Sequence, residues 1–356
     1  MKGKTIRRKA VLGAAGLLLL AGVAYAIDFG QLDDFENGVQ AWSGAPDPYG
    51  PSVVEDGGPM GAGDAFCRVE AIGGNGPGSR LAMDNVNQWL GNYTAAGVKV
   101  VQCDMKVLAG GALTIRPVMF GVEGTRYTAT NAYANALPAD GSWHHLNLFV
   151  TDVSMTNVNG GSETFAQVAE NAGLFMIRHN SGNPQAGGTI VIGVWGCDNI
   201  LATDHASFEP TSYQVTLGEE LDGGLSALTY SDDVRLRIIS DAATLMGAIE
   251  FTSKTPLVTP SRLTVRVEAY AARLGLQFTT ALYRYTTNQY QVLDGTVGST
   301  SDSVRQITLT STAANYISSS TGEMKARAVW SPINDEAPAF DGWELGVDQI
   351  AWDVYP

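Results

Sequence analysis

Apolar residues alternate with polar ones along many short segments of the chain, and glycine-rich turns separate these segments. Residues 98–107 give the clearest example: Cys103 and Met105 share one side of an extended chain, while Gln102 and Asp104 share the other. Alternation with a period of two is typical of a β-strand that has one apolar face. The pattern therefore predicts strands as the main elements of the fold.

The same pattern fills two stretches, each about the length of a domain. In the first, further strands are predicted at 113–120, 143–150, 173–179 and 188–195, and a helical pattern at 162–171. In the second, the clearest strands are predicted at 212–217, 263–270, 276–285, 324–330 and 343–354. Many short strands at near-regular spacing are typical of β-sandwiches. We expect an all-β protein with two β-sandwich (jelly-roll) domains in tandem, at 27–202 and 212–356, joined by a linker at 203–211.

The first 26 residues have the pattern of a secretory signal peptide. A basic head ending at Lys9 precedes an apolar run at 11–23, and the small residues Ala24 and Ala26 stand before the expected cleavage point. An apolar run of about 13 residues is too short to cross a bilayer, which takes about 20. We therefore expect a secreted protein, extracellular or on the cell surface, with no membrane insertion.

The chain is strongly acidic. It has 22 Lys and Arg against 36 Asp and Glu, a net charge of −14 at pH 7, and loss of the five basic residues of the leader would make the charge −19. Such a surface repels nucleic acid and suits a setting that contains divalent cations. Three cysteines, Cys67, Cys103 and Cys197, allow at most one internal disulfide. Their pairing stays open, because all three also fit buried apolar positions.

Acidic residues stand at both ends of the first predicted domain. Asp34 and Glu36 are two positions apart in the predicted first strand and would point to the same side, and Asp198 lies in the predicted last strand. If these two strands pair, the carboxylates meet, and calcium binds such oxygen ligands. The glycine-rich loop 55–64 offers backbone carbonyls and either Asp56 or Asp64. Solvated strand ends are the alternative interpretation of the same residues.

Two segments also carry a resemblance to a known family. Residues 32–36 (Leu-Asp-Asp-Phe-Glu) and 198–200 (Asp-Asn-Ile) resemble the first and last strands of galactose-binding-like jelly rolls. Among carbohydrate-binding modules, the family that binds mixed-linkage β-glucan begins in a similar way, and residues 140–144 resemble a turn and strand found late in those modules. The resemblance covers about 27–202. Because residues 143–145 also resemble laminin-G-like jelly rolls, the strand order stays open.

The resemblance implies a carbohydrate-binding domain with a structural calcium. Glu36 and Asp198 match the positions of the calcium ligands, and Asp34 and Asp64 are further candidates. In this picture calcium fixes the ends of the strands and does not contact the sugar.

Sugar recognition needs flat aromatic faces for the C–H surfaces of a pyranose and charged or amide groups for its hydroxyls. Arg116 and Arg178 stand out because each interrupts an apolar strand, so each should lie in a groove or pair with an acid. The expected ligand-binding residues for a polysaccharide or glycan are Arg116, Arg126, Tyr127, His145, Arg178 and His179.

A catalytic role is the competing hypothesis. A retaining glycosidase needs two carboxylates about 5 Å apart in a cleft, and no run in this sequence indicates such a pair. His144 and His145 are adjacent on a predicted strand and face opposite ways, which does not suit a zinc site. No nucleophile elbow, phosphate loop or dinucleotide fingerprint occurs. We therefore expect that the protein is not an enzyme, and a polysaccharide-degrading jelly roll is the less favoured alternative.

The second domain resembles a C-terminal β-sandwich found in secreted proteins of planctomycete-like bacteria, over about 208–356. Asp232-Asp233 is either a second calcium point or a solvated turn. We expect a display or assembly role, with a cell-surface partner contacted through this domain.

Together these observations predict a secreted, non-catalytic carbohydrate-binding protein with a structural calcium. A cell-surface structural or adhesion protein that binds another protein or itself is the alternative from a different class.

Overall fold

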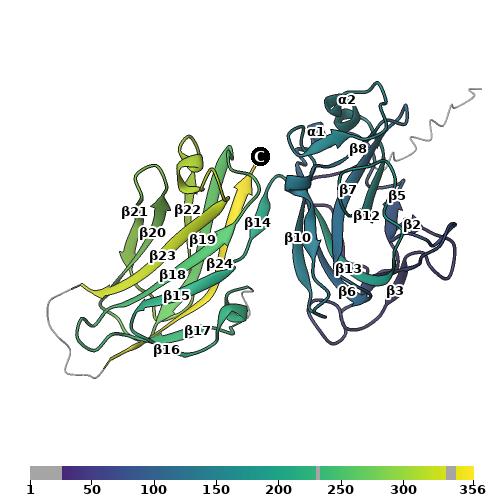
Figure 1. Cartoon of the computed structure of the whole chain (residues 1–356). Helices are drawn as coiled ribbons and strands as arrows, with labels where there is room; N and C mark the ends of the chain where they lie inside the picture. The colour runs from purple at the N-terminus through teal and green to yellow at the C-terminus, as the bar shows by residue number, and fades with distance from the viewer. Residues whose placement is uncertain (1–25, 230–232, 334–341) are drawn as a thin grey trace, which may run out of the picture.

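The computed structural model describes residues 26–229, 233–333 and 342–356, and antiparallel strands form two β-sandwiches placed side by side (Figure 1). The predicted all-β architecture of two sandwiches in tandem is confirmed. The predicted signal peptide lies outside the described residues, except for Ala26. Within the described ranges, no helix has the length and apolar character needed to span a bilayer.

The first sandwich consists of two sheets that enclose one apolar core. The inner sheet, which faces the second sandwich, has the order β10-β6-β13-β4-β3, and β1 pairs with β13. Its strands are β1 (Leu32–Asp33), β3 (Ser52–Val54), β4 (Phe66–Ile72), β6 (Val100–Ala109), β10 (His144–Phe149) and β13 (Ile192–Thr203). The first strand thus lies beside the last one, with Leu32 opposite Leu201 and Asp33 opposite Ile200.

The outer sheet of the first sandwich lies on the side away from the second sandwich (Figure 1). Its order is β11-β8-β7-β12-β5-β2, and β9 pairs with β7. Its strands are β2 (Trp42–Gly44), β5 (Ala82–Asn85), β7 (Leu113–Gly121), β8 (Arg126–Ala129), β9 (Asn135–Leu137), β11 (Met155–Asn157) and β12 (Ala172–His179). Alternation decides which side chains enter the core: Phe175 and Ile177 of β12 are fully buried there, whereas Met176 between them is only partly buried.

Short helices close the ends of this sandwich. They are α1 (Tyr93–Ala96), η1 (Asn131–Tyr133) and α2 (Phe165–Glu170). The predicted helix at 162–171 corresponds to α2. At its start, the side chain of Thr164 accepts a hydrogen bond from the backbone amide of Gln167, and the side chain of Gln167 accepts one from the backbone amide of Thr164. This capping box gives two backbone amides at the helix start a hydrogen-bond partner.

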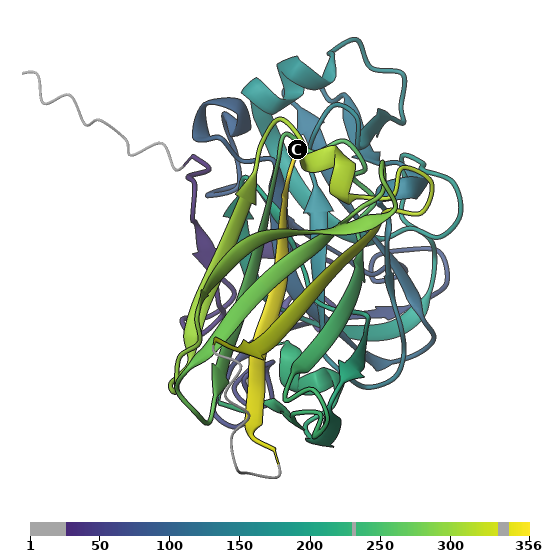
Figure 2. The same ribbon diagram turned by 90° about the vertical axis from the view of Figure 1, so that its left-hand side faces the viewer.

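The second sandwich has the same layered construction. One sheet has the order β16-β17-β24-β19-β22 with β14 paired to β24, and the other has the order β15-β18-β23-β20-β21. The strands of the first sheet are β14 (Ala206–Phe208), β16 (Glu219–Asp222), β17 (Leu236–Ile239), β19 (Arg262–Ala271), β22 (Ser303–Leu309) and β24 (Glu344–Tyr355). Those of the second are β15 (Ser212–Leu217), β18 (Gly247–Lys254), β20 (Leu276–Arg284), β21 (Gln289–Val297) and β23 (Glu323–Pro332), and the short helices are η2 (Leu225–Leu228) and η3 (Ala313–Tyr316). Figure 2 shows this sandwich in front of the first.

The connection between the sandwiches is itself structured. Residues 203–211, predicted as a linker, contain β14, whose Ala206 lies opposite Val354 of β24. The first sandwich adds Val100 and Phe149 to the apolar core of the second. An apolar contact and a shared strand at one seam restrict movement between the two sandwiches.

Polar side chains of the inner sheet complete this seam. Asn147 exchanges two hydrogen bonds with the backbone of Ser207: its Nδ2 donates to the carbonyl oxygen (2.6 Å) and its Oδ1 accepts from the amide (3.0 Å). Gln102 donates to the carbonyl oxygen of His205 (3.0 Å). The polar face of β6 is therefore buried as well, because the second sandwich covers it.

Candidate functional site

The three arginines proposed for ligand binding share one face of the outer sheet. Arg178 of β12 lies directly opposite Arg116 of β7, and directly opposed residues in an antiparallel pair point to the same side. Arg126 of β8 lies opposite Phe120, which is four positions from Arg116 on β7 and therefore on the same face. Ile115 and Ile177, on alternate positions, point into the core. The arginines thus lie on the face of the outer sheet that is turned away from the core. Figure 1 shows this sheet on the side of the first sandwich remote from the second.

Arg116 is held by a complete set of hydrogen bonds although only 1% of its surface is exposed. Its Nε donates to the carbonyl oxygen of Asn180 (3.1 Å), and its Nη1 to those of Ala129 (2.5 Å) and Thr130 (2.9 Å). Its Nη2 donates to Asn131 Oδ1 (2.7 Å) and to the carbonyl oxygen of Gly182 (2.7 Å). Burial lowers the pKa of Arg116, and the five acceptors compensate for the loss of water around its charge.

Three further arginines bind the same loop, residues 180–190. Arg178 donates to the carbonyl oxygens of Ala186 (2.7 Å) and Gln185, and Arg126 also points at the Ala186 carbonyl (3.5 Å). Arg80, at the end of a segment that bridges to this loop, donates through Nε to Gly188 (2.8 Å). Burial, together with the positive charges of Arg126, Arg116 and Arg80, lowers the pKa of Arg178 to about 10.

A polar groove lies beside this loop, with a volume of about 660 Å³. Its lining residues are Thr130, Asn131, Thr156, Asn157, Val158, Gly160 and Pro184. Asn131 joins the groove to the loop, because its Nδ2 donates to Asn183 Oδ1 (3.0 Å) while its Oδ1 accepts from Arg116. Hydroxyl and amide groups of this kind donate to and accept from sugar hydroxyls. The loop 180–190 contributes Pro184 to the lining of the groove, and the arginines hold this loop in place.

The other predicted ligand-binding residues lie elsewhere. Tyr127 is opposite Met119 on the core side of the outer sheet, where its hydroxyl donates to the carbonyl oxygen of Glu163 (3.0 Å). His179 is buried at the end of β12, and its Nδ1 accepts from the amide of Thr114 (3.0 Å). Neither side chain lies on the face that carries the arginines.

His145 belongs to the other sheet and faces the second sandwich. Its Nδ1 lies 3.0 Å from Asp104 Oδ1. Burial lowers the pKa of His145, but the hydrogen bond and charge of Asp104, with the charge of Glu209, raise it by more, so the net pKa is raised. Burial raises the pKa of Glu209 to about 7. His145 therefore belongs to the seam between the sandwiches, remote from the groove.

Of the predicted calcium ligands, Asp34 and Asp64 lie close enough to Asp198 for their charges to raise its pKa. The first strand, β1, is shorter than expected. The strand ends at Asp33, and Phe35 has a positive φ of 56° and a fully buried ring. Asp34 and Glu36 therefore do not lie in a strand, and the prediction that they point to the same side of one does not apply. Glu36 instead reaches the amide of Ala65 through Oε1 (2.8 Å), next to Asp64. Within the described ranges, the four carboxylates do not include three whose oxygens all lie within 4.8 Å of one another.

Asp198 has the most perturbed carboxyl of this group. It is 1% exposed, its Oδ1 accepts from the amide of Asn199 (2.7 Å), and its Oδ2 is buried with no hydrogen-bond donor. Burial, together with the charges of Asp64, Asp104 and Asp34, raises its pKa to about 8. A buried carboxylate oxygen without a donor, close to other acids, has the chemistry of a cation ligand.

The acid next to these residues, Asp33, has a different role that the sequence did not reveal. Its Oδ2 accepts from the indole nitrogens of Trp42 (2.7 Å) and Trp89 (2.6 Å) and from the side chain of Gln88 (3.2 Å). Burial raises its pKa, which these three donors partly offset. Asp33 thus anchors the first strand to the tryptophans of the core.

The cysteines pack in the core as free thiols. Cys67, Cys103 and Cys197 are all buried, and Cys67 and Cys197 are directly opposed on β4 and β13. Burial raises the pKa of Cys67 to about 12 and that of Cys197 well above its ordinary value. Such thiols remain protonated and unreactive.

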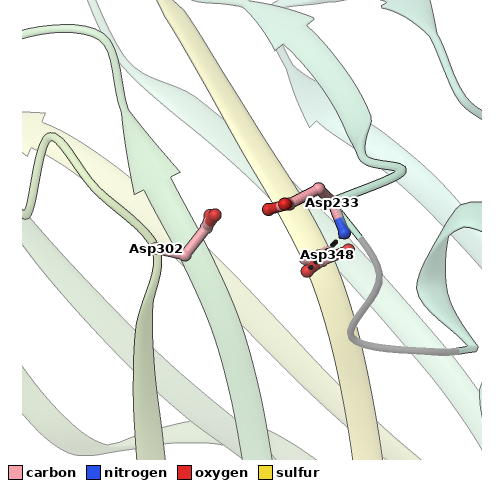
Figure 3. Close-up of side chains that lie close together, drawn as sticks. All are labelled: Asp233, Asp302 and Asp348. Carbon is pink, nitrogen blue, oxygen red and sulfur yellow. Dashed lines mark hydrogen bonds between the residues drawn. The ribbon is translucent and has the colours of Figure 1, made fainter.

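A second acidic group lies in the second sandwich (Figure 3). Oxygens of Asp233, Asp302 and Asp348 all lie within 4.8 Å of one another, and the amide of Asp233 donates to Asp348 Oδ2 (3.4 Å). Arg235 Nη2 contacts both Asp233 Oδ1 (2.6 Å) and Asp302 Oδ2, so a cation of the protein itself already balances part of this charge. Asp232, its neighbour in the predicted turn, lies outside the described residues.

Comparison with known proteins finds similar solved structures of low sequence identity. The chain is similar to the N-terminal tandem of two family 22 carbohydrate-binding modules of Paenibacillus barcinonensis Xyn10C, with 13% identity, a TM-score of 0.30, and coverage of 93% of this chain and 99% of that one. It is also similar to the family 11 carbohydrate-binding module of Clostridium thermocellum in complex with a β-1,3-1,4-mixed-linked tetrasaccharide (14% identity, TM-score 0.32, 50% and 96% covered). An exo-β-agarase is a further similar structure (12% identity, TM-score 0.34, 48% and 24% covered).

No protein-family model matches the chain, and no curated protein matches it either.

Proposed function

We propose that this chain is a secreted, non-catalytic carbohydrate-binding protein that binds a polysaccharide in the groove beside the loop 180–190. The observation that carries the proposal is the pairing of this groove with three arginines on the one face of the first sandwich that points away from the second. The inner sheet cannot serve in this way, because the second sandwich covers its polar face at Asn147 and Gln102.

The groove supports sugar binding by its size and its chemistry. A volume of about 660 Å³ falls within the range of small-molecule sites. Its threonine and asparagine side chains offer both donors and acceptors, as the hydroxyls of a sugar require. Because the loop is fixed by hydrogen bonds from Arg116, Arg178 and Arg80, little conformational entropy is lost when a ligand binds.

The proposal includes a structural calcium beside β1 and β13. Asp198 would coordinate the ion through Oδ2, which accepts no hydrogen bond within the described residues. Glu36, Asp64 and Asp34 would complete the set of oxygen ligands. Bound calcium would supply positive charge that compensates the buried carboxylate. The ion would tie the first and last strands of the sandwich together, away from the sugar.

A glycan array probed with the chain from residue 27 onward tests the binding proposal, with Thr156→Phe as the decisive variant. Thr156 lines the groove, and its hydroxyl donates no hydrogen bond to the described residues, so a phenyl ring there should obstruct the groove without removing a side-chain hydrogen bond. We expect the array signal to fall at least tenfold. Thr296→Phe on β21 of the second sandwich is the matched control and should bind as the wild type does.

The same experiment separates binding from the adhesion alternative. An array without signal, combined with self-association of the chain in light scattering, would favour the structural or adhesion function. Equal binding by the Thr156→Phe variant and the wild type would remove the groove from the proposal.

A further inference from the structure

The arginines of the first sandwich are distributed unevenly. The described part of this sandwich contains five, and Arg68 on β4 forms an ion pair with Glu70 (2.6 Å). The other four, Arg80, Arg116, Arg126 and Arg178, all donate to backbone carbonyls of the loop 180–190. In a chain with a net charge of −14, four of five arginines converge on one loop.

No acid compensates these four charges within the described residues. None of the four lies within 4.0 Å of a carboxylate. The loop 180–190 contains no charged residue. Asp84 lies on the same sheet face, opposite Met176, but its carboxylate accepts from Ser43 (3.0 Å). The hydrogen-bond acceptors of these four guanidinium groups are therefore neutral, and none of them is a carboxylate.

Two of these guanidinium groups keep unused hydrogen-bonding capacity. The Nε atoms of Arg126 and Arg178 are buried and have no acceptor. Arg178 is only 3% exposed, whereas Arg126 is partly exposed, with its guanidinium 4.8 Å from the centre of the Phe120 ring. The backbone of Arg126 adjoins the groove, because its carbonyl accepts from the amide of Val158 (2.9 Å), a residue that lines the groove. Arg80 is exposed, and its Nε contacts Gly188 of the same loop. A planar guanidinium with free N–H groups matches the oxygens of a carboxylate or a sulfate.

The geometry points to an acidic polysaccharide, one whose sugars carry carboxylate or sulfate groups, as the ligand of this groove. This inference rests on the proposed sugar-binding function and specifies its ligand class. The hydroxyl and amide groups of the groove bind the sugar hydroxyls, and Arg126 and Arg80 attract and bind the anionic groups. Because the rest of the surface is acidic, these charges also determine where a polyanion can approach.

The test is calorimetric titration of the chain from residue 27 onward with three probes. They are galacturonate oligomers, which carry carboxylates; sulfated galactan oligomers; and a neutral mixed-linkage β-glucan oligosaccharide. We expect at least one acidic probe to bind more tightly than the neutral one, and its affinity to fall as sodium chloride is raised. The stronger of the two acidic probes identifies the anionic group.

Arg126→Gln and Arg80→Gln are the informative variants, because both side chains are at least partly exposed. Each should weaken the acidic probe roughly tenfold, since each removes a charged donor. Arg126→Lys should recover part of the affinity, because it restores the charge but not the planar geometry. Arg68→Gln makes the same change of net charge on the other sheet and should leave binding unchanged. Thermal melting of each variant verifies that it is folded.

The outcomes separate the inference from the function on which it rests. Tight binding of the neutral probe alone would overturn the acidic ligand and leave sugar binding in place. Acidic binding that Arg68→Gln weakens as much as Arg126→Gln would show a general charge effect and overturn the assignment to this loop. Failure of all three probes, together with a silent array, would overturn both.

Discussion

Replacing the buried carboxylate of Asp198 by an amide tests the calcium proposal most directly. In Asp198→Asn the Oδ1 atom that accepts from the amide of Asn199 is kept, and only the charge is lost. Without calcium, the wild type must hold a nearly fully buried carboxyl beside Asp34, Asp64 and Asp104. We therefore expect the variant to be more stable than the wild type in chelator at pH 8.

The size and pH dependence of this effect follow from the raised pKa. Because the folded-state pKa of Asp198 rises from 3.8 to about 8, the folded protein retains a proton that the unfolded chain releases. This stabilisation is fully present below about pH 4 and is lost as the pH rises through about 8. At about 1.4 kcal/mol per pH unit the ceiling is near 6 kcal/mol, and relaxation with water entry at the strand end should reduce it to about 2–4 kcal/mol.

Urea denaturation followed by circular dichroism measures the effect at pH 5 and pH 8, in chelator and in calcium. Calcium at about 100 times its Kd should stabilise the wild type by about 2.7 kcal/mol and the variant by much less. Asp152→Asn makes the same chemical change at an exposed position of the first sandwich and should behave as the wild type. The reasoning fails if Asp198→Asn is the less stable protein in chelator at pH 8, or if calcium stabilises both proteins equally.

Two further predictions concern the loop and the seam. Arg116→Met should lower the free energy of unfolding by about 3 kcal/mol, because it leaves several buried acceptors without a donor; thermal melting measures this, and Arg68→Met should cost under about 1 kcal/mol. Asn147→Ala removes both hydrogen bonds to Ser207 and should cost about 2 kcal/mol. In scanning calorimetry it should also move the unfolding transitions of the two sandwiches apart, while the exposed Asn75→Ala leaves them as they are.

The sequence was sufficient for the architecture because alternation is a local signal. Residues 212–217, predicted as a strand, are β15, and the predicted pairing of first and last strands is observed between β1 and β13. Arg116 and Arg178 stood out because each interrupts an apolar strand, and in the fold they lie directly opposite each other on β7 and β12.

The parts that were missed depend on contacts between distant residues. Nothing in the local pattern distinguishes Asp33 from Asp34, because the difference arises from Trp42 and Trp89, which only the folded core brings to Asp33. His145 was predicted to bind a ligand, but the second sandwich packs against the inner sheet and buries it. The sequence around His145 does not indicate this packing. Arg80 gave no sequence signal, since its role requires the loop around Gly188 to fold back on it.

The contact between Asp33 and two indole nitrogens has an experimental consequence. Trp42 and Trp89 lie with their rings 5.9 Å apart, buried against a carboxylate that belongs to the first strand. Detachment of that strand would admit water to both rings and shift their fluorescence to longer wavelength. The chain thus carries an intrinsic optical probe next to Asp34, by which a metal titration can be followed without a label.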